Sequence, residues 1–331
     1  MSRPVAVVTG GAGFIGSHMV DLLLQNDYSV RVIDNLSGGR MDNLAQHSGE
    51  ARLAFEQADI CALPPNSSLF RRAELVFHFA GIGDIVPSIE KPLDYMATNV
   101  QGTVRVLEAS RNGGIGKLVY AASSSCYGLA DTPTREDHPI RPQYPYALSK
   151  YQGEQAAFHW MQVYRVPVNA IRIFNAYGTR VRTTGAYGAV FGVFFKQKLA
   201  GKPFTLVGDG SQRRDFVYVT DVARAFLLAG ETKMAGEIWN LGGGNPRSIN
   251  ELVQLIEGPV VHIPKRPGEP EVTFADITKI RRDLGWSPTV NFKDGVARML
   301  SDIYAWEGAP LWDPETIERA TATWFETLNR G

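Results

Sequence analysis

The pattern of hydrophobic and polar positions divides the first half of the chain into alternating strands and helices. Largely apolar runs, typical of strands that a parallel sheet buries on both faces, stand at 5–8, 28–34, 52–60, 75–81 and 117–122. Stretches with apolar residues at helical spacing, 17–24, 94–111 and 146–164, lie between and after them. This alternation predicts an α/β fold, a doubly wound, Rossmann-like parallel sheet.

The second half is less regular. Strands are predicted at 169–174, 204–207, 215–219 and 237–241, and helices at 190–200, 221–228 and 314–328. We expect one α/β domain over 1–178, to which 213–243 returns, and a smaller mixed domain formed mainly by 179–331. With 331 residues, the chain can bury the core of one large or two medium domains.

A glycine-rich turn joins the first strand to the first helix. Gly10, Gly13 and Gly16 stand three apart, where glycine permits positive φ and lets a pyrophosphate approach the backbone N–H groups. The second strand ends in Asp34, 18 residues beyond Gly16, near the spacing of a carboxylate that binds the adenosine ribose. Asp34 would repel a 2′-phosphate, which favours NAD, although Arg40 leaves NADP open. The alternative for Asp34 is an ordinary turn residue before Asn35.

Other polar or small residues follow the remaining strands. Asp59, Ala80, Gly81 and Ser123 stand at carboxyl ends, where doubly wound sheets bind ligands, so we expect them to line one crevice. Asp59 could equally cap a helix. His78 lies inside a strand, which indicates a buried core histidine rather than a ligand.

Tyr146 and Lys150 stand four apart on a predicted helix and therefore share one face. A nearby ammonium favours the phenolate form of tyrosine, which otherwise titrates near pH ~10. This pair predicts a tyrosine general base. A surface pair without chemistry is the alternative.

Composition narrows the class of protein. Lys plus Arg and Asp plus Glu both number 34, and this zero net charge argues against a nucleic-acid or membrane-surface role. No apolar run has transmembrane length, and the first strand begins too early to leave room for a signal peptide. The two cysteines, Cys61 and Cys126, favour a reduced, cytoplasmic setting. The six histidines show no metal-like pair.

Together, the glycine triplet, Asp34, the serine run 123–125 and the Tyr146/Lys150 pair resemble the short-chain dehydrogenase/reductase superfamily. The extended, nucleotide-sugar-modifying branch is the most similar. Further stretches that fit this branch are 34–40, 78–81, 98–103, 172–178, 208–217 and 266–269. The resemblance covers nearly the whole chain and is specific to the branch, but much less specific to one reaction.

The resemblance implies a role for individual residues. Tyr146 would be the catalytic base, Lys150 its partner and Ser123 the catalytic serine. The implied cofactor contacts are Gly10, Gly13, Phe14, Ile15, Gly16, Asp34, Asn35, Asp59, Ile60, Ala80, Gly81, Asn99, Tyr146 and Lys150. The implied substrate contacts are Ser124, Ser125, Asn175, Arg182, Arg214, Arg266 and Thr273, with the two arginines 214 and 266 on the diphosphate.

The resemblance also bears on the reaction. In 4,6-dehydratases an Asp-Glu pair follows the catalytic hydroxyl residue, whereas Ser124 and Ser125 stand there in this chain, as small or hydroxyl residues do in 4-epimerases. We therefore expect NAD-dependent 4-epimerisation of a nucleotide sugar, with a UDP-sugar favoured. A 4-dehydrogenase or reductase, a 4,6-dehydratase with displaced acids, a uronate 4-epimerase and a non-catalytic dinucleotide sensor remain alternatives.

Three finer expectations follow from the same resemblance. Arg182 stands where uronate 4-epimerases place an arginine for the carboxylate, whereas Asn175 departs from their threonine. Thr273 stands where a bulky tyrosine excludes N-acetyl groups, so we expect a roomier pocket. The helices 94–111 and 146–164 would pair with their symmetry mates in a homodimer.

Overall fold

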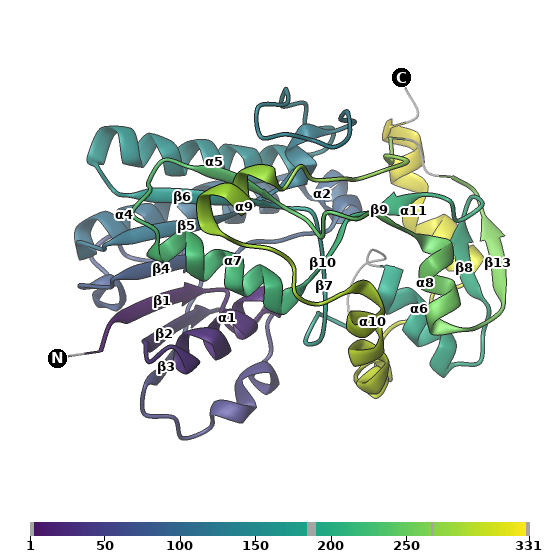
Figure 1. Cartoon of the computed structure of the whole chain (residues 1–331), viewed down its shortest axis with the longest axis horizontal. Helices are drawn as coiled ribbons and strands as arrows, with labels where there is room; N and C mark the ends of the chain where they lie inside the picture. Colours follow the sequence, from purple (N-terminus) through teal and green to yellow (C-terminus); the bar gives the residue numbers. More distant parts are fainter. Residues whose placement is uncertain (1–2, 184–189, 266–267, 329–331) are drawn as a thin grey trace.

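A seven-stranded parallel sheet runs through the chain in the order β11-β6-β5-β4-β1-β2-β3 (Figure 1). The computed structural model describes residues 3–183, 190–265 and 268–328. The strands are β1 (Val5–Thr9), β2 (Ser29–Asp34), β3 (Leu53–Gln57), β4 (Leu75–His78), β5 (Lys117–Ser123), β6 (Val168–Ile173) and β11 (Ile238–Leu241). The strand order reverses between β1 and β4, which creates a crevice at their carboxyl ends. The predicted fold class is confirmed.

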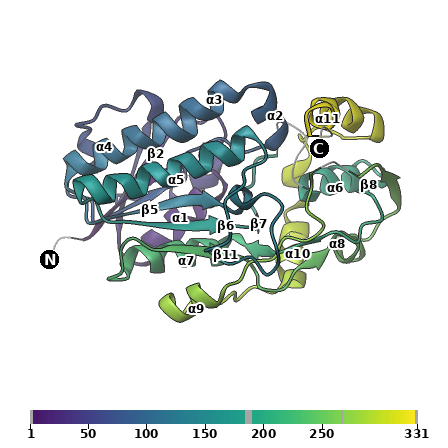
Figure 2. The same ribbon diagram turned by 90° about the horizontal axis from the view of Figure 1, so that it is seen from above.

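Helices cover both faces of this sheet (Figure 2). On one face, α1 (Phe14–Gln25) packs against α7 (Val219–Glu231), and α9 (Thr278–Leu284) lies beside them. On the other face lie α4 (Thr103–Gly113) and α5 (Pro145–Tyr164). Each face has its own cluster of buried apolar side chains, and their burial is the main favourable contribution to this layered structure.

The helix predicted over 94–111 forms, but it is not α-helical throughout. It consists of α3 (Pro92–Met96), a π-helical turn over Ala97–Gly102, and α4. Such turns widen the helix locally and are frequent at functional sites. The apolar spacing that predicted one helix does not distinguish an α-helical turn from a π-helical one, because the insertion adds only one residue.

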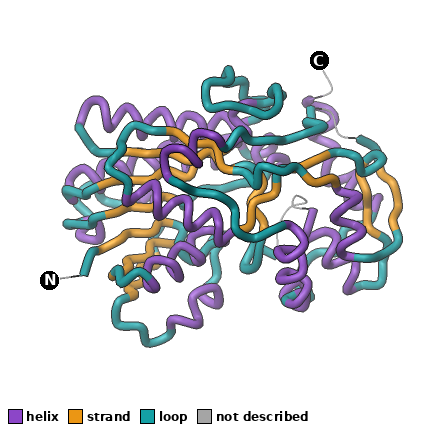
Figure 3. Tube along the Cα trace, viewed as in Figure 1, coloured by secondary structure: helices purple, strands orange, loops and turns teal. Residues whose placement is uncertain are grey.

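A second lobe lies at the far end of the sheet, and Figure 3 shows its mixture of helices and short strands. It contains α6 (Val190–Leu199), α8 (Ile249–Ile256), α10 (Phe292–Ser301) and α11 (Pro314–Leu328), with the parallel pair β8 (Phe204–Val207) and β13 (Val260–Ile263). Its core is aromatic, with Phe191, Phe194, Phe195 and Trp306 buried together.

Short strand pairs stand between the sheet and this lobe. β7 (Asn175–Tyr177) pairs with β10 (Phe216–Tyr218), and β9 (Arg213–Arg214) pairs with β12 (Arg247–Ser248). The strand predicted at 215–219 therefore forms, but it pairs with β7 outside the main sheet. Within the ranges that the structure describes, no helix combines the length and apolar character needed to cross a membrane.

Candidate active site

The turn after β1 brings two strand ends into close contact. Gly10 has a φ of +71°, and a Cβ there would lie 2.7 Å from the backbone nitrogen of Ala80, which follows β4. A Cβ on Gly16 would collide with the carbonyl oxygen of Gly10. Gly13 is the N-cap of α1 and offers no side-chain cap, so the first N–H groups of this helix face outward for an anion. This arrangement fits the pyrophosphate of a dinucleotide.

Asp34 ends β2 and is 7% exposed. Its Oδ2 accepts a hydrogen bond from the Ala12 N–H at 3.0 Å, and its Oδ1 accepts one from the Leu36 N–H at 2.8 Å. The exposed Asn35 accepts a bond from the Ser37 N–H. Asp34 thus stands beside the glycine turn and fixes the loop that follows β2, while each carboxylate oxygen keeps a further lone pair for a ribose hydroxyl.

Asp59 adopts the helix-cap role that the sequence left open. Its Oδ1 accepts a hydrogen bond from the Cys61 N–H at 2.8 Å and caps the short helix Ile60–Ala62. The Asp59 side chain is exposed and Ile60 is buried. The cofactor contacts implied for both residues stay predictions.

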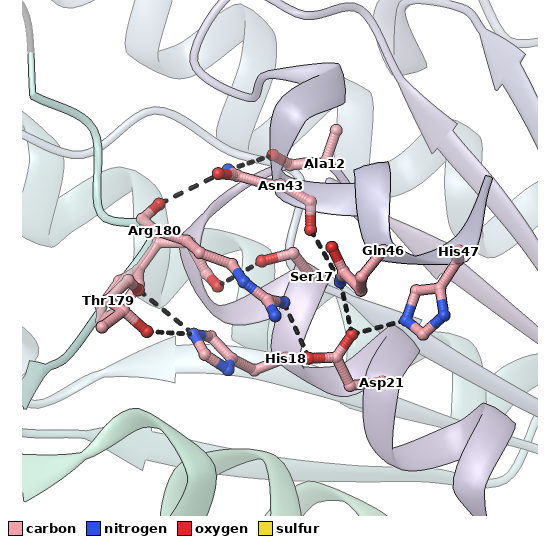
Figure 4. A network of polar contacts seen from close by, with 10 residues as sticks. Ala12, Ser17, His18, Asp21, Asn43, Gln46, His47, Thr179 and Arg180 are labelled. Carbon is pink, nitrogen blue, oxygen red and sulfur yellow. Dashed lines mark hydrogen bonds and ion pairs between the residues drawn. The ribbon is translucent and has the colours of Figure 1, made fainter. Parts of the chain in front are cut away.

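A polar cluster connects the glycine turn to the segment after β7 (Figure 4). Asp21 on α1 lies 2.6 Å from His47 Nε2 through one carboxylate oxygen and 2.8 Å from Arg180 Nη1 through the other. Asn43 donates to the carbonyl oxygens of Ala12 at 2.8 Å and Arg180 at 3.4 Å. These contacts hold the segment that carries Arg182 against the cofactor turn.

Tyr146, Ser123 and Lys150 come together at the carboxyl end of β5. The Tyr146 hydroxyl lies 3.4 Å from Ser123 Oγ, and Ser123 is 8% exposed. One helical turn later, the Lys150 ammonium lies over the ring of Tyr120, 4.5 Å from its centroid. Gly81 stands beside it, since a Cβ there would lie 3.8 Å from Lys150 Nζ. The predicted catalytic residues are therefore neighbours.

The sequence predicted that Lys150 lowers the pKa of Tyr146, and this prediction is wrong. Burial raises the pKa of Tyr146, a hydrogen bond to Ser123 lowers it, and the charge of Asp84 raises it again. Burial also lowers the pKa of Lys150 to about 8, partly offset by Glu154. The lowering that the spacing of Tyr146 and Lys150 predicted is therefore not found: the pKa of Tyr146 is raised, and desolvation is the largest cause.

Asn99 lies in the π-helical turn and is 1% exposed. Its Oδ1 accepts a hydrogen bond from the Ile82 N–H at 2.9 Å, while its Nδ2 donates to Ile82 O at 3.0 Å and Ser149 Oγ at 2.9 Å. Both ends of the amide are thus used within the protein. Asn99 positions the segment after Gly81 against α5, and its implied cofactor contact stays a prediction.

A cavity of about 570 Å³ lies beside Tyr146, between the sheet and the second lobe. Ser124 and Ser125 line it on the sheet side, and Asn175, Arg214 and Thr273 line it with the second lobe. All five were implied by the resemblance. Sequence reasoning missed other lining residues, among them Asp84, Gln143, Tyr144 and Trp324, because no motif marks them and they come from three separate segments.

The predicted arginines have different surroundings. Arg214 forms an ion pair with Glu269 at 2.6 Å and also donates to the carbonyl oxygen of Pro270. Arg182 is exposed, and its charge acts on Asp84 at the cavity. Arg266 lies outside the described residues. The diphosphate contacts of these arginines stay predictions.

A buried ion pair behind the serine run was also missed. The Arg172 guanidinium on β6 donates to both carboxylate oxygens of Glu154 on α5, at 2.6 and 2.9 Å, and both side chains are at most 4% exposed. Arg172 also donates to the Tyr127 hydroxyl at 2.7 Å, which in turn donates to Asn240. This network fixes the loop that carries Ser123–Ser125. Glu154 continues the spacing of Tyr146 and Lys150 by one more helical turn, a signal that could have indicated it.

The glycine turn, the half-buried Tyr146, the buried Lys150 and the adjoining cavity define a dinucleotide-dependent enzyme of the short-chain dehydrogenase/reductase type. A family model described as the NAD dependent epimerase/dehydratase family matches residues 6–242, and the chain belongs to this family. NAD is therefore the cofactor, as Asp34 predicted.

Known proteins agree with this assignment over most of their length. A UDP-glucose 4-epimerase from Mycolicibacterium smegmatis is 37% identical, over 88% of this chain and 96% of its own. A UDP-N-acetylglucosamine 4-epimerase from Methanobrevibacter ruminantium M1, in complex with UDP-N-acetylmuramic acid, matches with a TM-score of 0.85 and 30% identity, over 91% of this chain and 100% of its own. A UDP-glucuronic acid 4-epimerase from Bacillus cereus, in complex with UDP-glucuronic acid and NAD, matches with a TM-score of 0.84 and 32% identity, over 91% and 99%.

The relatives do not share one reaction. A dTDP-glucose 4,6-dehydratase from an Actinoplanes species is 32% identical, over 89% of this chain and 96% of its own. The comparisons therefore establish an NAD-dependent enzyme of the nucleotide-sugar epimerase/dehydratase type, and leave its reaction and sugar open.

Proposed function

We propose that this enzyme inverts the configuration at C4 of a UDP-sugar through a transient 4-keto intermediate, with Tyr146 as the base. The main support for this proposal is the position of the Tyr146 hydroxyl. It lies 3.4 Å from Ser123 Oγ, at the wall of a cavity large enough for a nucleotide sugar. Two serines, Ser124 and Ser125, continue the same wall.

Each residue of the site has its own role in the proposed reaction. NAD, when bound at the glycine turn, supplies hydride acceptance at C4 and hydride return to the other face. Tyr146 takes the proton of the C4 hydroxyl as the ketone forms and gives it back as the ketone is reduced. Ser123 hydrogen-bonds the same oxygen, and Lys150 holds the nicotinamide ribose. Asn175, Arg214 and Arg266 bind the sugar diphosphate.

Epimerisation is favoured over elimination by the side chains around Tyr146. Loss of water across C5 and C6 needs an acid–base pair beside the sugar, and hydroxyl groups such as those of Ser124 and Ser125 do not titrate in the required range. A 4,6-dehydratase is the second candidate, because Asp84 places one carboxyl group at the cavity, and burial raises its pKa.

The test is incubation of the purified enzyme with UDP-glucose, UDP-N-acetylglucosamine, UDP-glucuronate and dTDP-glucose, followed by NMR of the products and by NADH absorbance. A C4-epimeric product without lasting NADH supports the proposal. A 4-keto-6-deoxy product identifies a dehydratase, and a stoichiometric gain or loss of NADH identifies a net dehydrogenase or reductase. Either of the latter results contradicts epimerisation.

We also propose a homodimer formed by α3, α4 and α5. Leu93 on α3 is 81% exposed, and Leu148 and Val163 on α5 are 36% and 50% exposed, so both helices offer apolar side chains to a second copy of the chain. A reducing, cytoplasmic compartment stays a further prediction, and Cys61 and Cys126 are both free thiols.

A further inference from the structure

Asp84 has a strained backbone at the edge of the cavity. It follows β4 and directly precedes α2 (Ile85–Glu90), with φ 69° and ψ 122°, outside the regions that residues with a side chain favour. Such a conformation costs on the order of 1–3 kcal/mol and persists only where neighbours impose it. The Tyr95 hydroxyl helps to hold it here, because its one O–H lies within hydrogen-bond reach of the carbonyl oxygens of both Gly83 and Asp84.

The same tyrosine connects Asp84 to the proposed base. The ring of Tyr95 packs edge-on against that of Tyr146, with centroids 6.3 Å apart. Asp84 and Tyr146 line the same cavity, and the negative charge of Asp84 opposes ionisation of the phenol. A carboxylate in this place therefore does not assist ionisation of the base, and it borders the cavity in which the proposed function places the sugar.

Asp84 also determines the charge of the cavity wall. Among the described lining residues, the charged ones are Asp84, Arg214 and Glu269. Arg214 and Glu269 form an ion pair at 2.6 Å and offset each other. Arg182 acts on Asp84 from an exposed position outside this lining: its charge lowers the pKa of Asp84, whereas desolvation raises it by more. Among the described lining residues, Asp84 is therefore the one carboxylate without an ion-pair partner in the lining itself.

We propose that Asp84 is a specificity-determining residue that selects an uncharged hexose and rejects a uronic acid. Its carboxylate accepts hydrogen bonds from sugar hydroxyls, which are strengthened by its charge, and repels a sugar carboxylate. This inference rests on the proposed function and names its substrate class. It also assigns the Arg182 charge to balancing Asp84 rather than to binding a uronate.

The test compares the NAD-loaded enzyme with its Asp84→Asn variant, which keeps the shape and removes the charge. Asparagine also tolerates positive φ, so the strain is unchanged. Calorimetric titration should show the affinity for UDP-glucose falling about tenfold and the affinity for UDP-glucuronate rising at least tenfold, consistent with one charge-assisted hydrogen bond lost and one repulsion removed. The acid limb of the kcat/KM profile should also move to lower pH, because the phenolate of Tyr146 loses an opposing charge.

Glu90→Gln is the matched control, since Glu90 is an exposed acid at the other end of α2 and does not line the cavity. It should change neither affinity. The proposal is overturned if both affinities of Asp84→Asn change by the same factor, if Glu90→Gln reproduces the change, or if Asp84→Asn abolishes turnover as completely as loss of Tyr146. The calorimetric titrations are made in a Tyr146→Phe background, in which the bound sugar is not turned over, so a failure of 4-epimerisation would appear separately in the product analysis.

Discussion

The hydroxyl of Thr273 donates a hydrogen bond of 2.6 Å to Asn175 Oδ1, across 98 positions of sequence. The same hydroxyl accepts a bond from the Asp215 N–H at 3.2 Å. Both Thr273 and Asn175 line the cavity. The resemblance implied Thr273 and Asn175 as separate substrate contacts, and the structure joins them by a hydrogen bond in the cavity wall. The small side chain of Thr273 leaves the cavity wider at this point than a larger residue would.

Replacing Thr273 tests whether this small side chain leaves room for an N-acetyl group. Thr273→Tyr should reduce kcat/KM for UDP-N-acetylglucosamine at least tenfold more than for UDP-glucose, because the ring fills the space beside the sugar. Thr273→Val is the control: it loses the bond to Asn175 but keeps the volume, so it should affect both substrates equally. Equal losses in the tyrosine variant, or a wild-type enzyme inactive on the acetylated sugar, would contradict the prediction.

Tyr146→Phe should remove catalysis while leaving the fold and NAD binding intact. The hydroxyl is the group that exchanges the proton, and general acid–base groups contribute roughly 10²–10⁴-fold to rate. Steady-state kinetics and NAD titration measure the two properties. A phenylalanine variant that keeps more than half of the wild-type rate would show that another group is the base.

Removing one partner of the buried Arg172–Glu154 ion pair should destabilise the protein much more than removing both. Arg172→Met leaves a buried carboxylate without its partner and should cost about 3–5 kcal/mol of unfolding free energy. The double variant Arg172→Met/Glu154→Leu removes both charges and should recover most of this loss. Urea unfolding checks both, and a double variant no more stable than the single one would contradict the role of the unpaired charge.

His78 should make stability depend on pH. Burial, and then the charge of Lys150, lower its pKa from 6.5 to about 3, while its ring nitrogens lie 2.6 Å from Thr9 Oγ1 and 2.9 Å from Thr103 Oγ1. The unfolded chain binds a proton below pH ~6.5 and the folded chain does not, so this contribution is complete above ~6.5 and declines as pH falls toward ~3.

His78→Gln provides the measurement, because glutamine does not titrate. Between pH 7 and pH 5, the stability advantage of the wild type over this variant should shrink by about 2 kcal/mol. Urea unfolding at the two pH values gives the difference. An advantage that is the same at both would mean that His78 is not held neutral by the fold.

The proposed dimer gives a direct expectation for mass. Light scattering at micromolar concentration should report twice the 36.4 kDa of the chain. Leu93→Glu, at a position that is 81% exposed in the single chain, should shift the equilibrium toward the monomer by placing a charge in an apolar interface. A monomeric wild type would remove the proposal.

The sequence by itself determined the parts of this protein that short-range geometry controls. The run 5–8, the three glycines and the helix after them form the expected strand, turn and helix, because strand and helix periods are properties of the local backbone. Tyr146 and Lys150 share a helical face for the same reason. The serine run also follows its strand as expected, since the carboxyl ends of parallel strands meet at one edge.

Only the tertiary structure decided how these parts meet. The pKa of Tyr146 is raised mainly by desolvation in the folded chain, whereas the spacing to Lys150 had predicted a lowered pKa. The conformation of Asp84 is held with the help of Tyr95, and the serine loop is fixed by Arg172 and Glu154 from two other elements. Desolvation and long-range hydrogen bonds depend on which segments pack together, and neither leaves a periodic pattern in the residues that make them.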